Sequence, residues 1–315
     1  MLKKKAIKRI VVTTIALLVV LVVYSINKTD TVIYDDAYYI KENDMQEIYT
    51  ITKDNLVAKT SIYVNKNLDI EEQVRNVLSS MIEENNKNSL LPGYFKPILP
   101  KNTKILSVKL NDDIMTIDFS KELLNITEEQ SEKMIESIVY TTTNFDKVLG
   151  VSILVEGKSL KYVPNTSKEL NTILDNNYGI NKVYNITNNN NVEKVVLYYL
   201  SGIDDLYITP VTEYINTNKE KLEVIIDKLS NSYSYNNLIS YLNSSTKLLD
   251  YEINENVINL NFNENIYDSK EKKTIDTNSL NSIIYSIFDN YKVDKTNIFV
   301  NNNKILEKYR KDIEN

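Results

Sequence analysis

The sequence predicts an α+β fold built from two tandem copies of one small α/β sandwich, which follow an N-terminal transmembrane helix. Residues 103–124 alternate apolar and polar side chains on both sides of a polar tip, as the two strands of a β-hairpin do. The same pattern recurs without gaps at residues 246–267. An uncharged apolar run at residues 10–26 is the third observation. We expect each copy to follow the order β-β-α-β-β-α-β, with two helices on one face of a small sheet.

The repeated hairpin identifies the duplication because both its pattern and several of its residues recur. Five residues return at the same spacing: Thr103, Lys104, Leu106, Asn111 and Phe119 recur as Thr246, Lys247, Leu249, Asn254 and Phe262. The buried face is expected to consist of Leu106, Val108, Leu110, Met115, Ile117 and Phe119 in the first copy, and of Leu249, Tyr251, Ile253, Ile258, Leu260 and Phe262 in the second.

The N-terminal part predicts a membrane anchor. As a helix, the run at 10–26 spans about 25 Å, slightly less than a bilayer core of about 30 Å. Residues 1–9 are basic and are expected to stay in the cytoplasm by the positive-inside rule. The small residues of a signal-peptide cleavage site are missing after the run, so we expect a retained single-pass anchor rather than a cleaved signal peptide. Residues 27–45 are polar and are interpreted as a spacer.

The first domain is expected at residues 46–160. Its elements should be strands at 47–51 and 56–64, a helix at about 69–84, the hairpin, a second helix opened by the capping-box pair Thr127 and Gln130, and a last strand at 151–155. The buried helix faces are expected to be Ile70, Val74, Val77, Leu78, Met81 and Ile82, and then Met134, Ile135, Ile138, Val139 and Thr142.

The second domain is expected at residues 193–306, after a linker at 161–192 and before a tail at 307–315. Its elements should be strands at 195–200 and 206–211, a helix buried through Leu222, Ile225, Ile226 and Leu229, the hairpin at 247–262, a helix buried through Leu280, Ile283, Ile284, Ile287 and Phe288, and a strand at 298–300. In the linker, a short helix is expected at about 167–175, and the run Asn188–Asn191 is interpreted as a flexible joint.

Composition excludes several kinds of chemistry. The chain has no Cys and no His, which excludes disulfides, thiolate nucleophiles, histidine bases and nearly all structural zinc sites. The net charge is −6, and five basic residues with no acid lie at residues 1–9, so the remainder carries −11. An acidic body argues against nucleic-acid binding.

Candidate catalytic groups are few. Asp112, Asp113 and Asp118 are close enough in sequence for a metal or a carboxylate pair, but a turn and an outward strand position explain them better. Ser120 and Lys121 are adjacent, which is the wrong geometry for a Ser-Lys hydrolase. The segment between Gly150 and Gly157 reads as a strand, which excludes a phosphate loop. We therefore expect no catalytic, cofactor or metal residues and no small-molecule substrate.

Several motifs resemble the GerM (sporulation and spore germination) domain family. The segments that carry the resemblance are Pro100–Leu106, Ile117–Leu123, Ile138–Thr143 and Val151–Lys158 in the first copy, and Val196–Leu200 and Leu206–Val211 in the second. The first copy departs from the family pattern at Asn102, where the family often has Gly. In the second copy, Asn261 and Asn302 replace the Asp118 and Gly157 of the first.

The resemblance implies a non-enzymatic envelope protein of a spore-forming bacterium. GerM-type domains are similar in shape to the ring-building domains of secretion machines, which associate side by side and help to assemble complexes that span the two membranes around a developing spore. Its partners would be other membrane or envelope proteins, with self-association as an option, and its body would lie outside the cytoplasmic membrane. Two alternatives remain: a module that binds peptidoglycan or another wall ligand through a cleft with exposed aromatics, and a wall hydrolase with buried carboxylates in a shared pocket. The sequence does not identify the interaction residues.

Overall fold

The computed structural model describes Thr14 and residues 44–83, 91–202, 206–231 and 237–312. The transmembrane helix expected at residues 10–26 lies outside the described residues, apart from Thr14, and so does nearly all of the expected spacer. Within the part that the structure describes, no helix has the length and apolarity needed to cross a membrane.

The first copy follows the expected order and adds two short strands. Its elements are β1 (Met45–Thr52), β2 (Val57–Tyr63), α2 (Ile70–Ser80), β3 (Phe95–Lys96), β4 (Ile105–Asn111), β5 (Ile114–Phe119), the 3-10 turn η3 (Lys121–Leu124), α3 (Glu128–Thr143), β6 (Gly150–Val155) and β7 (Lys158–Ser159). The strands form two sheets, β2-β1-β3 and β4-β5-β6-β7, rather than the single small sheet that was expected.

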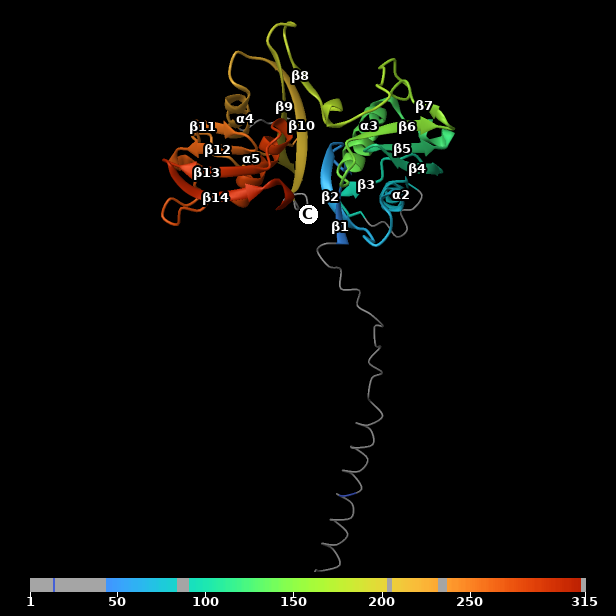
Figure 1. Ribbon diagram of the computed structural model, residues 1–315, viewed down its shortest axis with the longest axis horizontal. Coiled ribbons are helices and arrows are strands. Elements are labelled where there is room, and N and C mark those ends of the chain that lie inside the picture. The colour runs from blue at the N-terminus through green and yellow to red at the C-terminus, as the bar shows by residue number, and fades with distance from the viewer. Residues whose placement is uncertain (1–13, 15–43, 84–90, 203–205, 232–236, 313–315) are drawn as a thin grey trace, which may run out of the picture. The chain divides into compact units, whose positions relative to one another are not determined.

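The second copy repeats this arrangement (Figure 1). Its elements are β9 (Val192–Ser201), β10 (Tyr207–Asn216), α4 (Lys221–Ser230), β11 (Leu248–Asn254), β12 (Val257–Phe262), the 3-10 turn η5 (Glu264–Ile266), α5 (Thr277–Asn290), β13 (Lys295–Val300), β14 (Asn303–Tyr309) and the 3-10 turn η6 (Arg310–Asp312). The strand orders are β8-β10-β9 and β11-β12-β13-β14, so a strand from the expected linker completes the first of these sheets.

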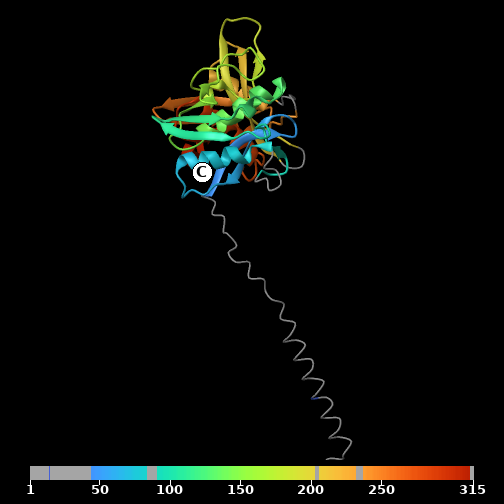
Figure 2. The same cartoon turned by 90° about the vertical axis from the view of Figure 1, so that its right-hand side faces the viewer.

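The connection between the copies differs from its prediction. The helix expected at 167–175 is wrong, because Leu174 exchanges two backbone hydrogen bonds with Val151 instead. After η4 (Asn176–Tyr178), β8 (Val183–Asn185) pairs in parallel with β10. The side chain of Asn216 donates to the carbonyls of Asn188 and Asn190, so the expected flexible joint is a hydrogen-bonded turn. Figure 2 shows the yellow β8–β10 region standing out at one end of the body.

The hairpins form as expected, but their outer strands carry a β-bulge. In each copy the pairing register shifts by one residue at the same place, leaving Leu106 and Leu249 without a cross-strand partner. These leucines are 46% and 53% exposed, and Ile253 is 42% exposed, so the expected inward position of these three residues is wrong. The inner strands are as expected. Met115, Ile117, Phe119, Ile258, Leu260 and Phe262 are all fully buried.

The helices bury the faces that their periodicity predicts. The described contacts place α3 against β1 and β6, α5 against β9, and α2 against β4. Thr127 is the N-cap of α3 but makes no side-chain cap hydrogen bond, so the predicted capping box is absent. Each copy has its own apolar core. The cores meet between the copies, because Leu56 of the first copy packs in the second core and Tyr207 of the second packs against the first.

Two truncations test the bulged geometry. We expect Phe119→Ala to lower the free energy of unfolding by about 3–5 kcal/mol, because it empties a fully buried site. Leu106→Ala should change it by less than about 0.5 kcal/mol, because the side chain is half exposed. Urea unfolding followed by circular dichroism measures both. A large loss for Leu106→Ala would place this residue in the core and contradict the bulge.

Candidate functional site

The two copies meet through equivalent elements. Strands β2 and β10, which occupy the same place in the two copies, run side by side at the centre of the body (Figure 1). The hydroxyls of Tyr49 and Tyr198 lie close enough across this boundary for each residue to influence the pKa of the other. Both tyrosines are held in the same way, since the backbone N–H of Tyr49 donates to Thr141 Oγ1 and that of Tyr198 donates to Ser286 Oγ, each at 2.9 Å. Because equivalent elements of the two copies face each other, the copies are related by an approximate twofold axis, as the subunits of an isologous dimer are.

Four tyrosines and one carboxylate fill this junction. Tyr140 lies edge-on to Tyr49 with ring centroids 5.5 Å apart, and Tyr285 stacks on Tyr198 at 5.3 Å. Tyr198 Oη donates to Asp289 Oδ2 at 2.6 Å. Desolvation by the surrounding protein raises the pKa of the Asp289 carboxyl above its usual value, although the residue as a whole is exposed and Tyr198 and nearby cations act in the opposite direction. Burial also raises the pKa of the Tyr49, Tyr140 and Tyr198 hydroxyls, which are therefore neutral at physiological pH.

A lysine of the first copy completes the junction from β2. The Lys59 ammonium lies 4.1 Å from the centre of the Tyr285 ring in the second copy. It also forms an ion pair with Glu47 at 2.6 Å, and its side chain is almost fully buried. A buried lysine held between a carboxylate of its own copy and an aromatic ring of the other couples the packing of the two copies.

The connecting segment forms a second set of bridges. The side chain of Asn181 donates to the carbonyl of Val57 in β2 at 2.6 Å and to that of Pro210 in β10 at 2.8 Å. Its neighbour Lys182 forms ion pairs with Glu136 at 2.8 Å and Glu132 at 2.9 Å, both on α3. The Lys182 and Glu136 side chains are buried, and burial raises the pKa of Glu136. The segment therefore fastens the copies together.

The rim of the junction is apolar and aromatic. Tyr207 of the second copy stacks on Tyr94 of the first with ring centroids 4.7 Å apart, and it meets Phe95 edge-on at the same distance. Stacked and edge-on rings of this kind add about 0.5–1.5 kcal/mol each beyond their burial. The junction thus combines an apolar rim with a hydrogen-bonded polar centre.

Asp118, the carboxylate considered for a metal, has a structural role in the described structure. Its Oδ1 accepts the backbone N–H of Gly157 at 3.0 Å, which fixes the turn between β6 and β7. In the second copy Asn261 Oδ1 accepts the N–H of Asn302 at 2.9 Å in the corresponding turn. Glycine suits its position because φ is +74°. The substitution from aspartate to asparagine therefore preserves the hydrogen bond.

The other candidate residues are also engaged locally. Asp112 and Asp113 form the two-residue tip of the hairpin with φ of 46° and 64°. Ser120 Oγ accepts the N–H of Lys104 at 3.0 Å, and Asn263 Oδ1 accepts that of the equivalent Lys247 at 3.1 Å. Among the residues that the structure describes, no three acidic side chains gather as metal ligands would.

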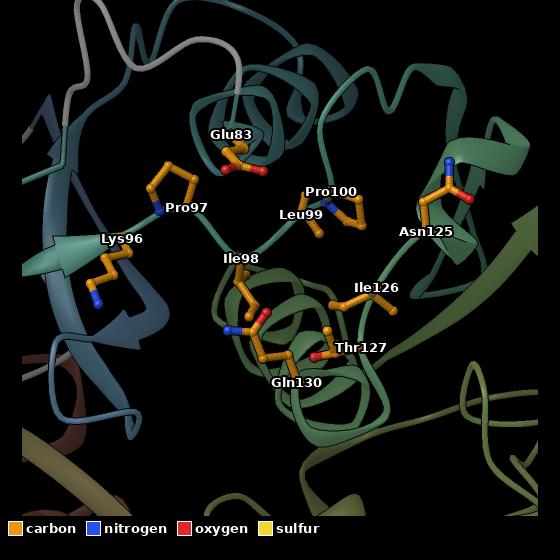
Figure 3. Close-up of a pocket in the computed structure, with 10 residues that line it drawn as sticks. All are labelled: Glu83, Lys96, Pro97, Ile98, Leu99, Pro100, Asn125, Ile126, Thr127 and Gln130. Atoms are coloured by element: carbon orange, nitrogen blue, oxygen red, sulfur yellow. The ribbon is translucent and has the colours of Figure 1, made fainter.

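Two surface hollows were not expected from the sequence. One, of about 330 Å³, lies in the first copy between the end of α2, the segment after β3 and the start of α3 (Figure 3). Its apolar wall includes Pro97 and Ile126, and Glu83, Lys96 and Gln130 stand around it. The Pro-rich segment that shapes it has no counterpart in the second copy, so no repeated pattern in the sequence could indicate it.

The second hollow, of about 400 Å³, lies beside β10 and α4. Amides and charged side chains line much of it, including Asn185, Asn216 and Lys228. The exposed Tyr184 stacks on Tyr214 with ring centroids 4.9 Å apart, as a sugar-binding platform would. Neither of these rings lines the hollow.

Comparison with known proteins identifies a family whose sequence model matches the chain. The sequence model of the Germane family, described as "Sporulation and spore germination", matches residues 36–161 and 196–306, one segment for each copy. The spore germination protein GerM of Bacillus subtilis (strain 168) is 26% identical over 281 residues, which are 87% of this chain and 75% of that protein. The solved tandem GerMN domains of the sporulation protein GerM from Bacillus subtilis match with a TM-score of 0.74 and 24% identity, over 82% of this chain and 91% of that one. This last likeness shows the fold.

A pH series tests the Asp289 carboxylate. Because the Asp289 pKa is raised in the folded state, the carboxyl destabilises the fold increasingly as the pH rises from about 4, its unfolded value, through the raised pKa. Asp289→Asn removes this trend. We expect the free energy of unfolding of the wild type, minus that of the variant, to fall as the pH rises. Urea titrations from pH 4 to about 9 measure this difference. The variant Asp268→Asn, at an exposed site, controls for losing one charge. A constant difference would contradict the raised pKa.

Paired substitutions test the turn held by Asp118. Asp118→Ala removes the acceptor of the Gly157 N–H and should cost about 1 kcal/mol of local stability, whereas Asp118→Asn should retain most of it, as the second copy does. Hydrogen exchange of the β6–β7 turn measures the local effect. We expect faster exchange in the alanine variant only, and equal acceleration in both variants would show that the charge, rather than the acceptor, holds the turn.

Proposed function

The chain belongs to the Germane family of sporulation and spore germination proteins, and from this premise we propose that it is a non-enzymatic, membrane-anchored component of a multiprotein envelope complex. In this proposal it stabilises the complex through protein–protein contacts during sporulation or germination. The relative that covers most of the chain is named a spore germination protein, which supports the process but does not define the partners.

The observation that carries the proposal is the junction between the copies. Lys59, Asn181, Lys182 and the tyrosine cluster fasten the two copies into one body with buried, hydrogen-bonded contacts. A rigid body of this kind holds its outer surfaces at fixed spacing, which suits a component that positions other proteins. A hinged pair of modules would instead have a small and weakly packed boundary.

The engagement of the motif residues supports a non-enzymatic role. Asp118 and Ser120 are two polar residues of the segment that resembles the GerM pattern. The side-chain oxygen of each accepts a hydrogen bond from a backbone N–H group. Catalytic carboxylates and nucleophiles instead point into a site that substrate can reach. The residues that resemble the family therefore hold the hairpin and its neighbouring turns.

The anchor and the location belong to the same proposal. The uncharged run at residues 10–26, with basic residues before it, would place the N-terminus in the cytoplasm and the two copies outside the cytoplasmic membrane. During sporulation, a chain made in either cell and inserted in this way would face the space between the two membranes. Its partners would then be membrane or envelope proteins that enter that space.

Crosslinking in sporulating cells tests the proposal. We expect affinity capture of the full chain after crosslinking, followed by mass spectrometry, to recover integral membrane proteins of an envelope complex. A matched control carries Lys59→Ala together with Asn181→Ala, which removes junction contacts from both bridges and should reduce this recovery at equal protein level. Recovery of wall fragments alone, or of nothing above background, would contradict the contact role and favour wall binding or a hydrolase.

A further inference from the structure

A carboxylate is buried in the second copy at a position where the first copy has an apolar side chain. Glu213 lies on β10 and is only 1% exposed. When Tyr49 and Tyr198 are aligned, the registers of the β1–β2 and β9–β10 pairs place Ile62 of β2 at the same position. Ile62 is buried as well. The fold that the copies share therefore does not require a charged group at this place.

Two side chains that carry nitrogen meet this carboxylate. Lys228 Nζ, from the last turn of α4, lies 2.6 Å from Glu213 Oε2. Asn185 Nδ2, from β8, reaches the same oxygen at 3.5 Å. Lys228 and Asn185 both line the hollow beside β10 and α4 (Figure 1). Because both nitrogens contact one oxygen, a rotation about the flexible lysine stem can bring its amine to the amide carbon of Asn185.

An ion pair alone is a poor explanation for this arrangement. Taking two charges out of water costs about as much as their attraction returns, and an apolar side chain in the same place is often as stable or more so. The first copy has such a side chain in Ile62. A lysine, a carboxylate and a carboxamide in contact can instead react with one another. They supply a nucleophile, a group that carries protons and an acyl group.

We propose that the side chains of Lys228 and Asn185 join in an amide bond, with Glu213 as the acid and base of the reaction. The Lys228 ammonium first passes a proton to Glu213 along their 2.6 Å contact, which leaves a neutral amine and a neutral carboxyl. The burial of Glu213 favours this neutral pair over two separated charges. The amine Nζ then attacks Cγ of Asn185 as the nucleophile.

The reaction balances without any further reactant. The Nζ–Cγ bond forms and the Cγ–Nδ2 bond breaks, and Glu213 carries one proton from Nζ to Nδ2. The amide nitrogen of Asn185 leaves as ammonia, which takes up the proton that remains on Glu213 and departs through the hollow as ammonium. Glu213 is restored as a carboxylate, and no atom changes its oxidation state.

The bond fastens β8 to α4. Strand β8 has only three residues and lies at the edge of its sheet. A covalent link to α4 fixes this strand, and with it the segment that connects the copies, to the second copy. A cross-link of this kind stabilises a fold mainly by restricting the unfolded chain, as a disulfide does, and this chain has no cysteine. The inference goes beyond the proposed function and does not depend on it.

The intact mass of the purified full chain tests the bond. We expect the folded protein, after overnight incubation at neutral pH, to be lighter than its sequence by about 17 Da, the mass of one ammonia. Trypsin does not cleave after an acylated lysine, so the digest should contain peptides of β8 and α4 joined through Lys228 and Asn185. Lys228→Arg and Glu213→Gln should each abolish the loss. Lys219→Arg changes a lysine of the same hollow, is the matched control and should keep the loss.

The wild-type chain decides the inference even if a variant does not fold. A mass equal to that of the sequence overturns it. A loss of about 17 Da that persists in Lys228→Arg would come from a succinimide at an asparagine, and a gain of about 1 Da at Asn185 would mean that water attacks the amide. Both results overturn the inference as well. If circular dichroism shows that Glu213→Gln is unfolded, the joined peptide and the Lys228→Arg variant carry the test.

Discussion

The hydrogen bond from Tyr198 to the carboxylate of Asp289 is the constraint around which the body is arranged. Tyr198 is itself buried between the two copies and needs a polar partner for its hydroxyl, and the Asp289 carboxylate supplies it. The packing of β2 on β10, the bridge through Asn181 and the aromatic rim all require the registration that this centre fixes. An apolar junction would tolerate sliding, whereas a polar one is satisfied in a single arrangement.

The repeated hairpin motif is likewise defined by the hydrogen bonds that it makes. The hairpin, the bulge after its first residue and the acceptor that holds the following turn occur in both copies, although the acceptor is Asp118 in one and Asn261 in the other. What is preserved is a hydrogen-bond geometry and not a chemical group. A pattern that resembles a family can therefore mark a folding requirement, and the surfaces that differ between the copies are the places to look for specific contacts.

Period and repetition predicted the regular parts of the fold. The helix faces at Val74–Met81 and Met134–Thr142 and the inner strands of both hairpins follow from spacing alone. The bulge does not, because one inserted residue reverses the facing of Leu106 without changing the composition. The junction also escaped prediction. Tyr140 and Tyr285 fall at equivalent positions, but Tyr49, Lys59 and Asp289 join them only in three dimensions, and in a chain with 23 tyrosines no single one stands out.

The place where the chain enters the body has a mechanical consequence. Strand β1 begins at Met45 and lies between β2 and β3, antiparallel to both. Tension from the N-terminal side acts along this strand, so its hydrogen bonds are loaded in shear and must fail together rather than one after another. Because β1 also carries Tyr49 and Glu47 into the junction, the same load is spread over both copies. A body built in this way resists being pulled open from its N-terminal side.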